Sequence, residues 1–353
     1  MEHINRRETK KVKVGNVEIG GDAPILVQSM TNTFTKNIDA TVKQILELEE
    51  AGCEIIRVAV ADIEDAEAIS KIKKQIHIPI VADIHFDYRL ALKSIENGID
   101  KLRINPGNIG SMERVQKVVE KAKPRNIPIR IGVNAGSIHK KILEKYNGEP
   151  TAVGMVESAL EHVKILEDLD YDNIVLSMKG TDIKMTVDAY KMMSTKVNYP
   201  LHLGITHSGT LFDGSIRSAI GVGSLLLEGI GDTMRISLTD DPREEVKVAR
   251  EILKSLGLRN FGINYITCPT CGRTKIQLIE LSKKVQDGLK GVDKPITVAI
   301  MGCAVNGPGE ARQSDIGIAG GAGEALLFKR GKIIKKIKED EIVSTLLEEI
   351  EKL

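Results

Sequence analysis

Residues 25–255 of the chain alternate between short apolar runs and amphipathic helical patterns, and this alternation constrains the fold more than any other feature. Short, uniformly apolar runs are typical of strands that are buried on both faces of a parallel sheet. Eight such runs, each followed by a helical pattern, predict an α/β fold with a closed (β/α)8 TIM barrel; a doubly wound open sheet is the alternative. The expected strands are residues 25–30, 54–60, 78–84, 101–105, 128–133, 173–178, 201–206 and 233–238.

The pattern changes after the eighth helical stretch. We predict two domains, a substrate-binding TIM barrel at residues 1–258 and a smaller α+β domain at residues 259–353 that carries three of the cysteines. Alternating valines and isoleucines around Gly15 and Asn16 predict a small β-hairpin before the first barrel strand. In the second domain the expected strands are residues 263–266, 295–301 and 325–328, and the expected helices are residues 274–289 and 340–352.

The composition excludes several classes of protein. Lys and Arg total 50 and Asp and Glu total 49, so the chain lacks the positive field of a nucleic-acid coat protein. Aromatic residues make up 3% and Trp is absent, which argues against base stacking. No apolar stretch is long enough to span a membrane, and the polar start lacks the apolar region of a secretory signal. We therefore expect a cytoplasmic protein that binds neither nucleic acid nor membrane.

Positive side chains gather at the carboxyl ends of the predicted strands, where barrel enzymes place their catalytic groups. Arginine forks match phosphate oxygens, so converging cations predict a small phosphorylated ligand. The alternative is that each cation pairs with a carboxylate at the rim, where Asp83 is the only evident acid. The five cations are Arg57, Arg103, Arg130, Lys179 and Arg235.

Uncharged and titratable groups accompany these cations. Asp83 and His85 are two residues apart on one strand, so they point the same way and can move protons or hold hydroxyl groups. The alternative is that one of them is a core polar residue. Asn side chains just past a strand end suit hydroxyl or phosphate contacts, although Asn is also an ordinary turn residue. The further polar candidates for the rim are Asn105, Asn134, Ser177 and Ser237.

Three cysteines lie late in the chain, Cys268 and Cys271 in a CxxC pair and Cys303 about thirty residues later. Three thiolates do not complete a tetrahedral zinc site, and no histidine follows His207. A four-iron cluster has four corners, and Glu310 is the nearest candidate for an oxygen ligand. A zinc site that staples the tail and a redox dithiol remain alternatives to an iron–sulfur cluster.

Several motifs together resemble one known family, the 4-hydroxy-3-methylbut-2-enyl diphosphate synthases of the methylerythritol phosphate route to isoprenoids. The resemblance covers essentially the whole chain. The motifs that carry it are VQSMTNT (27–33), IRVAV (56–60), ADIHFDYRLAL (82–92), LRINPGNIG (102–110), RIGVNAGS (130–137), HLGIT (202–206), EGIGDTMRISL (228–238), CPTCGR (268–273) and MGCAVNGPGEA (301–311).

The resemblance implies a barrel that binds 2-C-methyl-D-erythritol 2,4-cyclodiphosphate and a second domain with a [4Fe-4S] cluster. Ferredoxin or flavodoxin is the implied electron donor. Asp83 and His85 would face the carbon skeleton. The implied cluster ligands are Cys268, Cys271, Cys303 and Glu310. The implied diphosphate cage is Arg57, Arg103, Arg130, Asn134, Lys179, Arg235 and Ser237.

One position departs from the family pattern, which reads TEAG where this chain has Thr206-His207-Ser208-Gly209. The family glutamate is a suspected acid/base group. An imidazole can donate a proton at neutral pH but is not a permanent anion, so His207 either takes the role or leaves it to another group. A tolerated rim substitution and an impaired or altered activity are the alternatives.

The predicted connectivity also suggests a homodimer. The eighth helix returns to the end of the barrel opposite the rim, so a domain attached there begins far from its own barrel mouth. A head-to-tail pair in which each second domain serves the other barrel solves this, and a large rotation within one chain is the rival. Two other classes of function remain open: a non-redox phosphate-ligand transferase with a zinc-stapled tail, and a sensor that uses the cluster as a redox gauge.

Overall fold

A computed structural model describes residues 4–303, 309 and 311–353. The chain divides into two compact units, the first ending at Arg259 and the second beginning at Asn260. Each unit has its own sheet and its own hydrophobic core.

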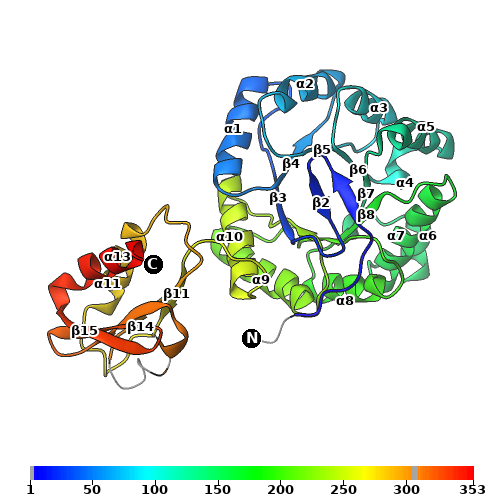
Figure 1. Cartoon of the computed structure of the whole chain (residues 1–353). Coiled ribbons are helices and arrows are strands. Elements are labelled where there is room, and N and C mark those ends of the chain that lie inside the picture. The colour runs from blue at the N-terminus through cyan, green and yellow to red at the C-terminus, as the bar shows by residue number, and fades with distance from the viewer. Residues whose placement is uncertain (1–3, 304–308, 310) are drawn as a thin grey trace. The chain divides into compact units, whose positions relative to one another are not determined.

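The first unit is a parallel eight-stranded barrel (Figure 1). Its strand order runs β8-β7-β6-β5-β4-β3-β10-β9, and a bridge between Leu176 and Leu201 joins the two ends of the sheet. The predicted TIM barrel is therefore confirmed and the open-sheet alternative is wrong. The strands are β3 (Leu26–Met30), β4 (Ile55–Ala59), β5 (Ile80–Asp83), β6 (Lys101–Ile104), β7 (Ile129–Asn134), β8 (Ile174–Lys179), β9 (His202–Leu203) and β10 (Thr233–Met234).

The last two barrel strands are shorter than the sequence predicts. Past Leu203 the regular strand pairing ends at Gly204. This glycine lies against the Lys179 side chain and the Arg235 backbone. A Cβ at Gly204 would sit 2.4 Å from the Lys179 Nζ and 2.6 Å from the Arg235 carbonyl oxygen. Only glycine permits this close approach, which brings two of the rim cations near each other.

A ring of helices surrounds the strands, and short polar side chains cap several of them. Asp62 accepts from the Asp65 N–H at the start of α2, and Thr151 accepts from the Gly154 N–H at the start of α7. The main helices are α1 (Ile38–Glu50), α2 (Ile63–Lys73), α3 (Tyr88–Glu96), α5 (Met112–Ala122), α7 (Ala152–Glu167), α8 (Ile183–Ser194), α9 (Leu211–Leu227) and α10 (Pro242–Ser255). Two short helices, α4 (Pro106–Ile109) and α6 (Lys140–Lys145), are too brief to show a periodic pattern and were not predicted.

The predicted hairpin closes the amino-terminal end of the barrel. It consists of β1 (Val12–Val14) and β2 (Val17–Ile19), joined by a turn in which Gly15 has a φ of +57°. In Figure 1 the hairpin, in dark blue, crosses the centre of the ring. Its apolar side chains pack on residues at the starts of the strands, namely Leu26, Ile55, Val81 and Val175. The hairpin therefore covers the amino-terminal end of the barrel interior.

The second unit is a five-stranded mixed sheet with two helices packed against it. The sheet contains β11 (Asn264–Thr267), β12 (Thr297–Met301), β13 (Ile316–Gly320), β14 (Glu324–Lys329) and β15 (Lys332–Lys338), and the helices are α11 (Leu278–Gly288) and α13 (Ile342–Glu351). Strands β13 and β15 were missed, because glycines interrupt the first and lysines dominate the second. The first helix begins at Leu278 rather than at residue 274, because Thr274 and Lys275 bond to Cys271 and Gly302 instead.

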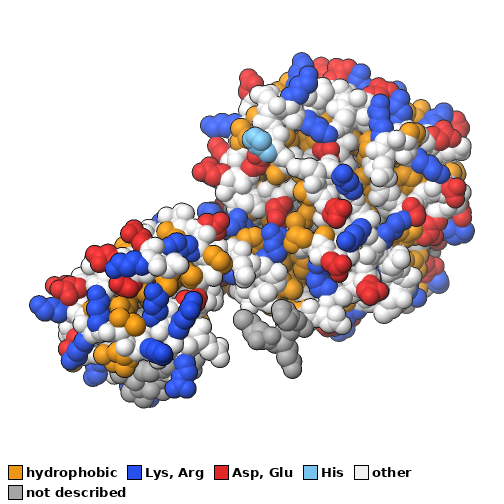
Figure 2. Space-filling model, in the orientation of Figure 1, with side chains coloured by type: hydrophobic (Ala, Val, Ile, Leu, Met, Phe, Trp, Pro, Cys, Tyr) orange, Lys and Arg blue, Asp and Glu red, His pale blue; other side chains and the backbone are white. Residues whose placement is uncertain are grey.

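The surface carries charges of both signs. Figure 2 shows Lys and Arg side chains interspersed with Asp and Glu over the visible face, which agrees with the near-neutral net charge. Among the residues that the structure describes, no helix is both long enough and apolar enough to cross a membrane.

Candidate active site

A cavity of about 250 Å³ opens at the carboxyl ends of the barrel strands. Side chains from seven of the eight predicted strand ends line it, although these strands are far apart in the sequence. The lining residues are Arg57, Asp83, His85, Arg103, Arg130, Asn134, Ser177, Lys179, Thr206, Arg235 and Ser237.

Asp83 is the acid at the centre of one side of this cavity. Its carboxylate lies 3.0 Å from the Arg103 Nη1 and 3.6 Å from the Arg57 Nη1. Burial opposes its ionisation, but attraction from Arg57 and hydrogen bonding with His85 outweigh burial and hold the pKa of Asp83 well below its usual range. Asp83 is therefore a fixed negative charge that orients two arginines.

A second acid that the sequence analysis missed holds another arginine. Arg235 forms a two-point ion pair with Glu245 of α10, at 3.1 and 3.3 Å, and Glu245 is 4% exposed. The prediction that Asp83 is the only acid at the rim was therefore wrong. Glu245 was overlooked because it lies in the first turn of a helix, whereas the search covered strand ends. The acidic first turn that follows Pro242 was the available signal.

Two of the five cations form no ion pair within the described part of the chain. Arg130 is 1% exposed, and its Nε and Nη1 have no hydrogen-bond partner there. Lys179 is 8% exposed. Burial, reinforced by repulsion from neighbouring cations, lowers the pKa of both groups well below their usual values. The cavity therefore holds more positive than negative groups, and an anion would relieve the imbalance.

Uncharged groups complete the lining. His85 is half exposed, and its Nε2 lies 3.6 Å from the Asp83 carboxylate. Asn134, Ser177 and Ser237 lie around the same cavity, as does Thr206, which ends the seventh predicted strand. Amide, hydroxyl and imidazole groups beside a cationic cage suit a ligand that carries both phosphate and hydroxyl oxygens.

Two residues predicted for the rim do not line the cavity. Asn105 is buried just before α4, where its carbonyl oxygen accepts from the Asn108 N–H. His207 is exposed, with a left-handed φ of +52°. It directly follows Thr206, so it lies at the edge of the site and not within the lining.

The second unit brings two cysteines to neighbouring strand ends. Cys268 follows β11, and Cys303 lies two residues past the end of the adjacent parallel strand β12. The Gly302 N–H donates to the Cys268 Sγ over 3.1 Å. Cys271 is exposed, and hydrogen bonding from the Arg273 backbone N–H lowers the pKa of its thiol.

The donor chemistry of this region fits an iron–sulfur cluster. All three cysteines are free thiols, and N–H groups directed at sulfur are a feature of such centres. Within residues 4–303, 309 and 311–353, no three metal-ligating side chains converge closely enough to hold an ion. Glu310, the predicted fourth ligand, lies outside the described residues.

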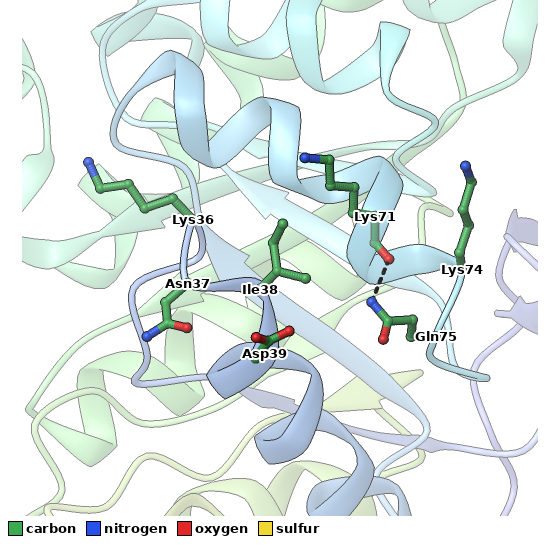
Figure 3. Close-up of a pocket in the computed structure, with 7 residues that line it drawn as sticks. All are labelled: Lys36, Asn37, Ile38, Asp39, Lys71, Lys74 and Gln75. Carbon is green, nitrogen blue, oxygen red and sulfur yellow. Dashed lines mark hydrogen bonds between the residues drawn. The ribbon is translucent and has the colours of Figure 1, made fainter.

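A larger hollow lies elsewhere on the barrel, but its chemistry is unspecific. It is an open groove of about 630 Å³ beside the start of α1 and the end of α2. In Figure 3 the ammonium groups of Lys36, Lys71 and Lys74 lie apart from one another, and Gln75 bonds back to the Lys71 carbonyl. Because no polar groups converge there, we assign the site to the barrel mouth.

Comparison with known proteins identifies relatives over the full length. Residues 9–250 match the GcpE TIM-barrel domain, and residues 264–352 match the GcpE protein C-terminal domain. A Clostridium perfringens protein named 4-hydroxy-3-methylbut-2-en-1-yl diphosphate synthase (flavodoxin) is 60% identical over 348 residues, which is 99% of both chains. A protein of the same name from Lysinibacillus sphaericus is 58% identical and covers all of this chain and 95% of its own.

Solved structures of two other enzymes align with part of the chain. Dihydropteroate synthase from Stenotrophomonas maltophilia aligns with a TM-score of 0.52 at 12% identity, covering 70% of this chain and 97% of its own. Type I 3-dehydroquinate dehydratase from Clostridium difficile aligns with a TM-score of 0.52 at 15% identity, covering 71% of this chain and all of its own. At such low identity these matches support the fold only.

Proposed function

This chain belongs to the GcpE family of 4-hydroxy-3-methylbut-2-en-1-yl diphosphate synthases, and we propose from this premise how its residues carry out that reaction. The chain is an oxidoreductase of isoprenoid biosynthesis. It converts 2-C-methyl-D-erythritol 2,4-cyclodiphosphate to 4-hydroxy-3-methylbut-2-enyl diphosphate. The conversion adds two electrons, opens the ring at a C–O bond to the diphosphate and releases water.

The observation that carries the site assignment is the excess of buried positive charge in the barrel mouth. Arg130 and Lys179 form no ion pair in the described part of the chain, so a bound diphosphate would supply their counter-charge. As the ring C–O bond breaks, negative charge grows on the diphosphate leaving group. Preorganised guanidinium groups stabilise that charge without having to move, and Lys179 lies beside them in the same lining.

The remaining lining groups position the carbon skeleton. We propose that Asp83 fixes the orientation of Arg57 and Arg103, and that His85 contacts substrate hydroxyl groups. Asn134, Ser177 and Ser237 supply further hydrogen bonds around the same cavity. Asn105 is buried before α4 and lies outside the lining. We propose that it acts on the substrate only through neighbouring residues.

The second unit supports the proposal of a [4Fe-4S] cluster held by Cys268, Cys271 and Cys303, with Glu310 as the fourth ligand. When bound, such a cluster supplies the electrons one at a time. Flavodoxin appears in the names of the relatives, and we propose a flavodoxin or a ferredoxin as the donor. A cytoplasmic location stays a prediction from the sequence.

Turnover of the cyclodiphosphate tests both the function and the role of His207. With an anaerobically purified protein and a chemical reductant, we expect the allylic diphosphate as product. We propose that His207 donates a proton, so His207→Gln should lower kcat about 100-fold, within the range for general acid catalysis. His207→Glu should restore most of the rate, and product analysis by mass spectrometry gives both results.

The pH profile separates an acid role from a structural one. If His207 moves a proton, its replacement changes the shape of the pH profile of kcat, whereas a structural role lowers kcat equally at every pH. We therefore expect the pH profile of His207→Gln to differ in shape from that of the native enzyme. An unchanged rate and profile in that variant would remove His207 from the mechanism, and absence of product from the native protein would defeat the proposed function itself.

We also propose a homodimer in which each second unit serves the partner's barrel. The first unit ends at Arg259, which donates to the Ile25 carbonyl over 2.8 Å and pairs with Glu54. Both partners directly precede barrel strands, so the linker leaves from the amino-terminal end, whereas the cavity opens at the carboxyl end. A partner's second unit reaches the opening without crossing its own barrel.

Mixing two inactive variants tests this arrangement. Arg130→Met removes the barrel function and Cys271→Ala removes the cluster function. If sites are shared between chains, random exchange of subunits should recover about a quarter of the native specific activity, since half of the dimers are mixed and each has one intact site. Activity that stays at the level of the separate variants would place the whole reaction within one chain.

A further inference from the structure

Beneath the lining of the active site lies a buried lysine that the proposed mechanism does not use. Lys101 is the first residue of β6, is 0% exposed, and its Nζ has no hydrogen-bond partner within the described residues. It points to the same face of the strand as Arg103, two residues later, which lines the cavity. Lys101 therefore lies one layer deeper inside the barrel.

This deeper layer is unusually polar. Interior layers of such barrels are normally filled by branched apolar side chains. Here His202 is 0% exposed, with its Nδ1 2.9 Å from the Thr233 Oγ1 and its Nε2 without a partner among the described residues. Gln28 is 1% exposed, and both of its side-chain polar atoms are likewise unpartnered in that part of the chain. The apolar hairpin seals the barrel below this layer.

The charges around Lys101 disfavour its ammonium form. Burial, followed by repulsion from Arg130 and Arg57, lowers the pKa of Lys101 well below its usual range. The buried carboxylates of Asp83 and Glu245 are already paired with arginines of the lining. The charged and titratable groups that face this interior are Arg57 (β4), Asp83 (β5), Arg103 (β6), Arg130 (β7), Lys179 (β8), His202 (β9), Arg235 (after β10) and Glu245 (α10).

We propose that Lys101 is a switchable counter-charge for the diphosphate: an uncharged amine in the empty barrel, which takes a proton from solvent when the cyclic diphosphate fills the cavity above it. This inference rests on the proposed function for the identity of the ligand. Lys101 is a positioning residue, because Arg57, Arg103 and Arg130 lie between it and the phosphates. Its role is to strengthen the field of the cage only when the anion is present.

Two properties of the ligand make the switch measurable. Each phosphorus of the cyclic diphosphate carries one strongly acidic oxygen, so the ligand itself does not titrate near neutral pH. Any proton taken up on binding therefore belongs to the protein. By linkage, a group whose pKa is higher in the complex than in the free protein weakens binding as the pH rises between those two values.

Isothermal titration calorimetry of the native protein with the cyclodiphosphate, in HEPES and in Tris, measures this proton count. Between the two pKa values we expect uptake of about one proton per ligand, and a Kd that rises about tenfold for each pH unit. The Lys101→Met variant should bind without proton uptake and with a flat pH dependence. Lys117→Met, a helix-surface change in α5, is the matched control and should behave like the native protein.

Three outcomes would overturn the inference. Uptake retained in Lys101→Met would place the proton on another buried base, Lys179 or His202, and a His202→Gln variant that loses it would assign it to the histidine. Binding by the native protein with no uptake would show that Lys101 does not change its charge. If Lys101→Met fails to fold, the native protein and His202→Gln are compared instead. Proton uptake that occurs in the native protein but not in His202→Gln then contradicts the inference. Failure of the cyclodiphosphate to bind native protein would instead count against the proposed function.

Discussion

Cys271→Ala should leave a folded protein with no reductive turnover. Cys271 is an exposed free thiol whose pKa is lowered by the Arg273 N–H, as a metal-ligating thiolate requires. Removing it leaves a four-iron cluster with too few protein ligands, so we expect activity below about 1% of the native value and less than half of the native iron and sulfide. Alanine is preferred to serine because a serine oxygen can itself bind iron.

Cys53→Ala is the matched control for this experiment. Cys53 is buried in the barrel, where burial raises the pKa of its thiol to about 12 and makes it an inert apolar residue. We expect its replacement to leave iron, sulfide and turnover unchanged. Native protein that contains zinc but no iron or sulfide would contradict the cluster and favour the zinc-stapled alternative. Full turnover in Cys271→Ala would remove this residue from the ligand set.

Arg130→Met should lower activity and raise stability in the same protein. Arg130 is a nearly fully buried cation with two unpartnered nitrogen atoms and no ion pair among the described residues. Loss of one preorganised group for the developing diphosphate charge should reduce kcat/KM by about 100- to 1,000-fold. Removing an unpaired buried charge should stabilise the free protein by about 1–3 kcal/mol, measured by urea unfolding.

A second arginine separates this effect from a general loss of charge. Arg259 lies outside the cavity and pairs with Glu54 at 2.9 Å. Arg259→Met should destabilise the fold, because it leaves a half-buried carboxylate without its partner, and should leave kcat/KM nearly unchanged. If Arg130→Met destabilised the protein as well, Arg130 would be a structural residue with a counter-ion, and the argument for an anion site would lose its main support.

The periodic parts of the fold were predictable because periodicity is a local property. The eight barrel strands and their helices follow from apolar runs and helical spacing, and the hairpin follows from alternation around Gly15. The missed elements lack that signal. Strand β15 is rich in lysine, and strand β13 is interrupted by glycine, so their pairing with β14 decides their structure.

The cavity lining was predictable for a related reason. Parallel strands bring their carboxyl ends to one face, so a residue's place at a strand end gives its place in space. Arg57, Arg103 and Lys179 meet at one cavity for this reason. Glu245 was missed, because its contact with Arg235 joins the first turn of a helix to a strand end across the irregular segment 235–241. No periodic spacing in the sequence predicts that the Arg235 and Glu245 side chains meet.

The sequence alone determined the chemistry that is present: cations and hydroxyl groups at strand ends, and three thiols in a separate domain. Only the tertiary structure decided the charge state that this chemistry takes. Asp83 is a fixed anion, Arg130 lacks an ion pair in the described chain and Lys101 is sealed in a polar layer, because each depends on burial and on neighbours from other strands. Residue types are local facts, whereas solvation and Coulomb energies depend on distances that only the closed barrel sets.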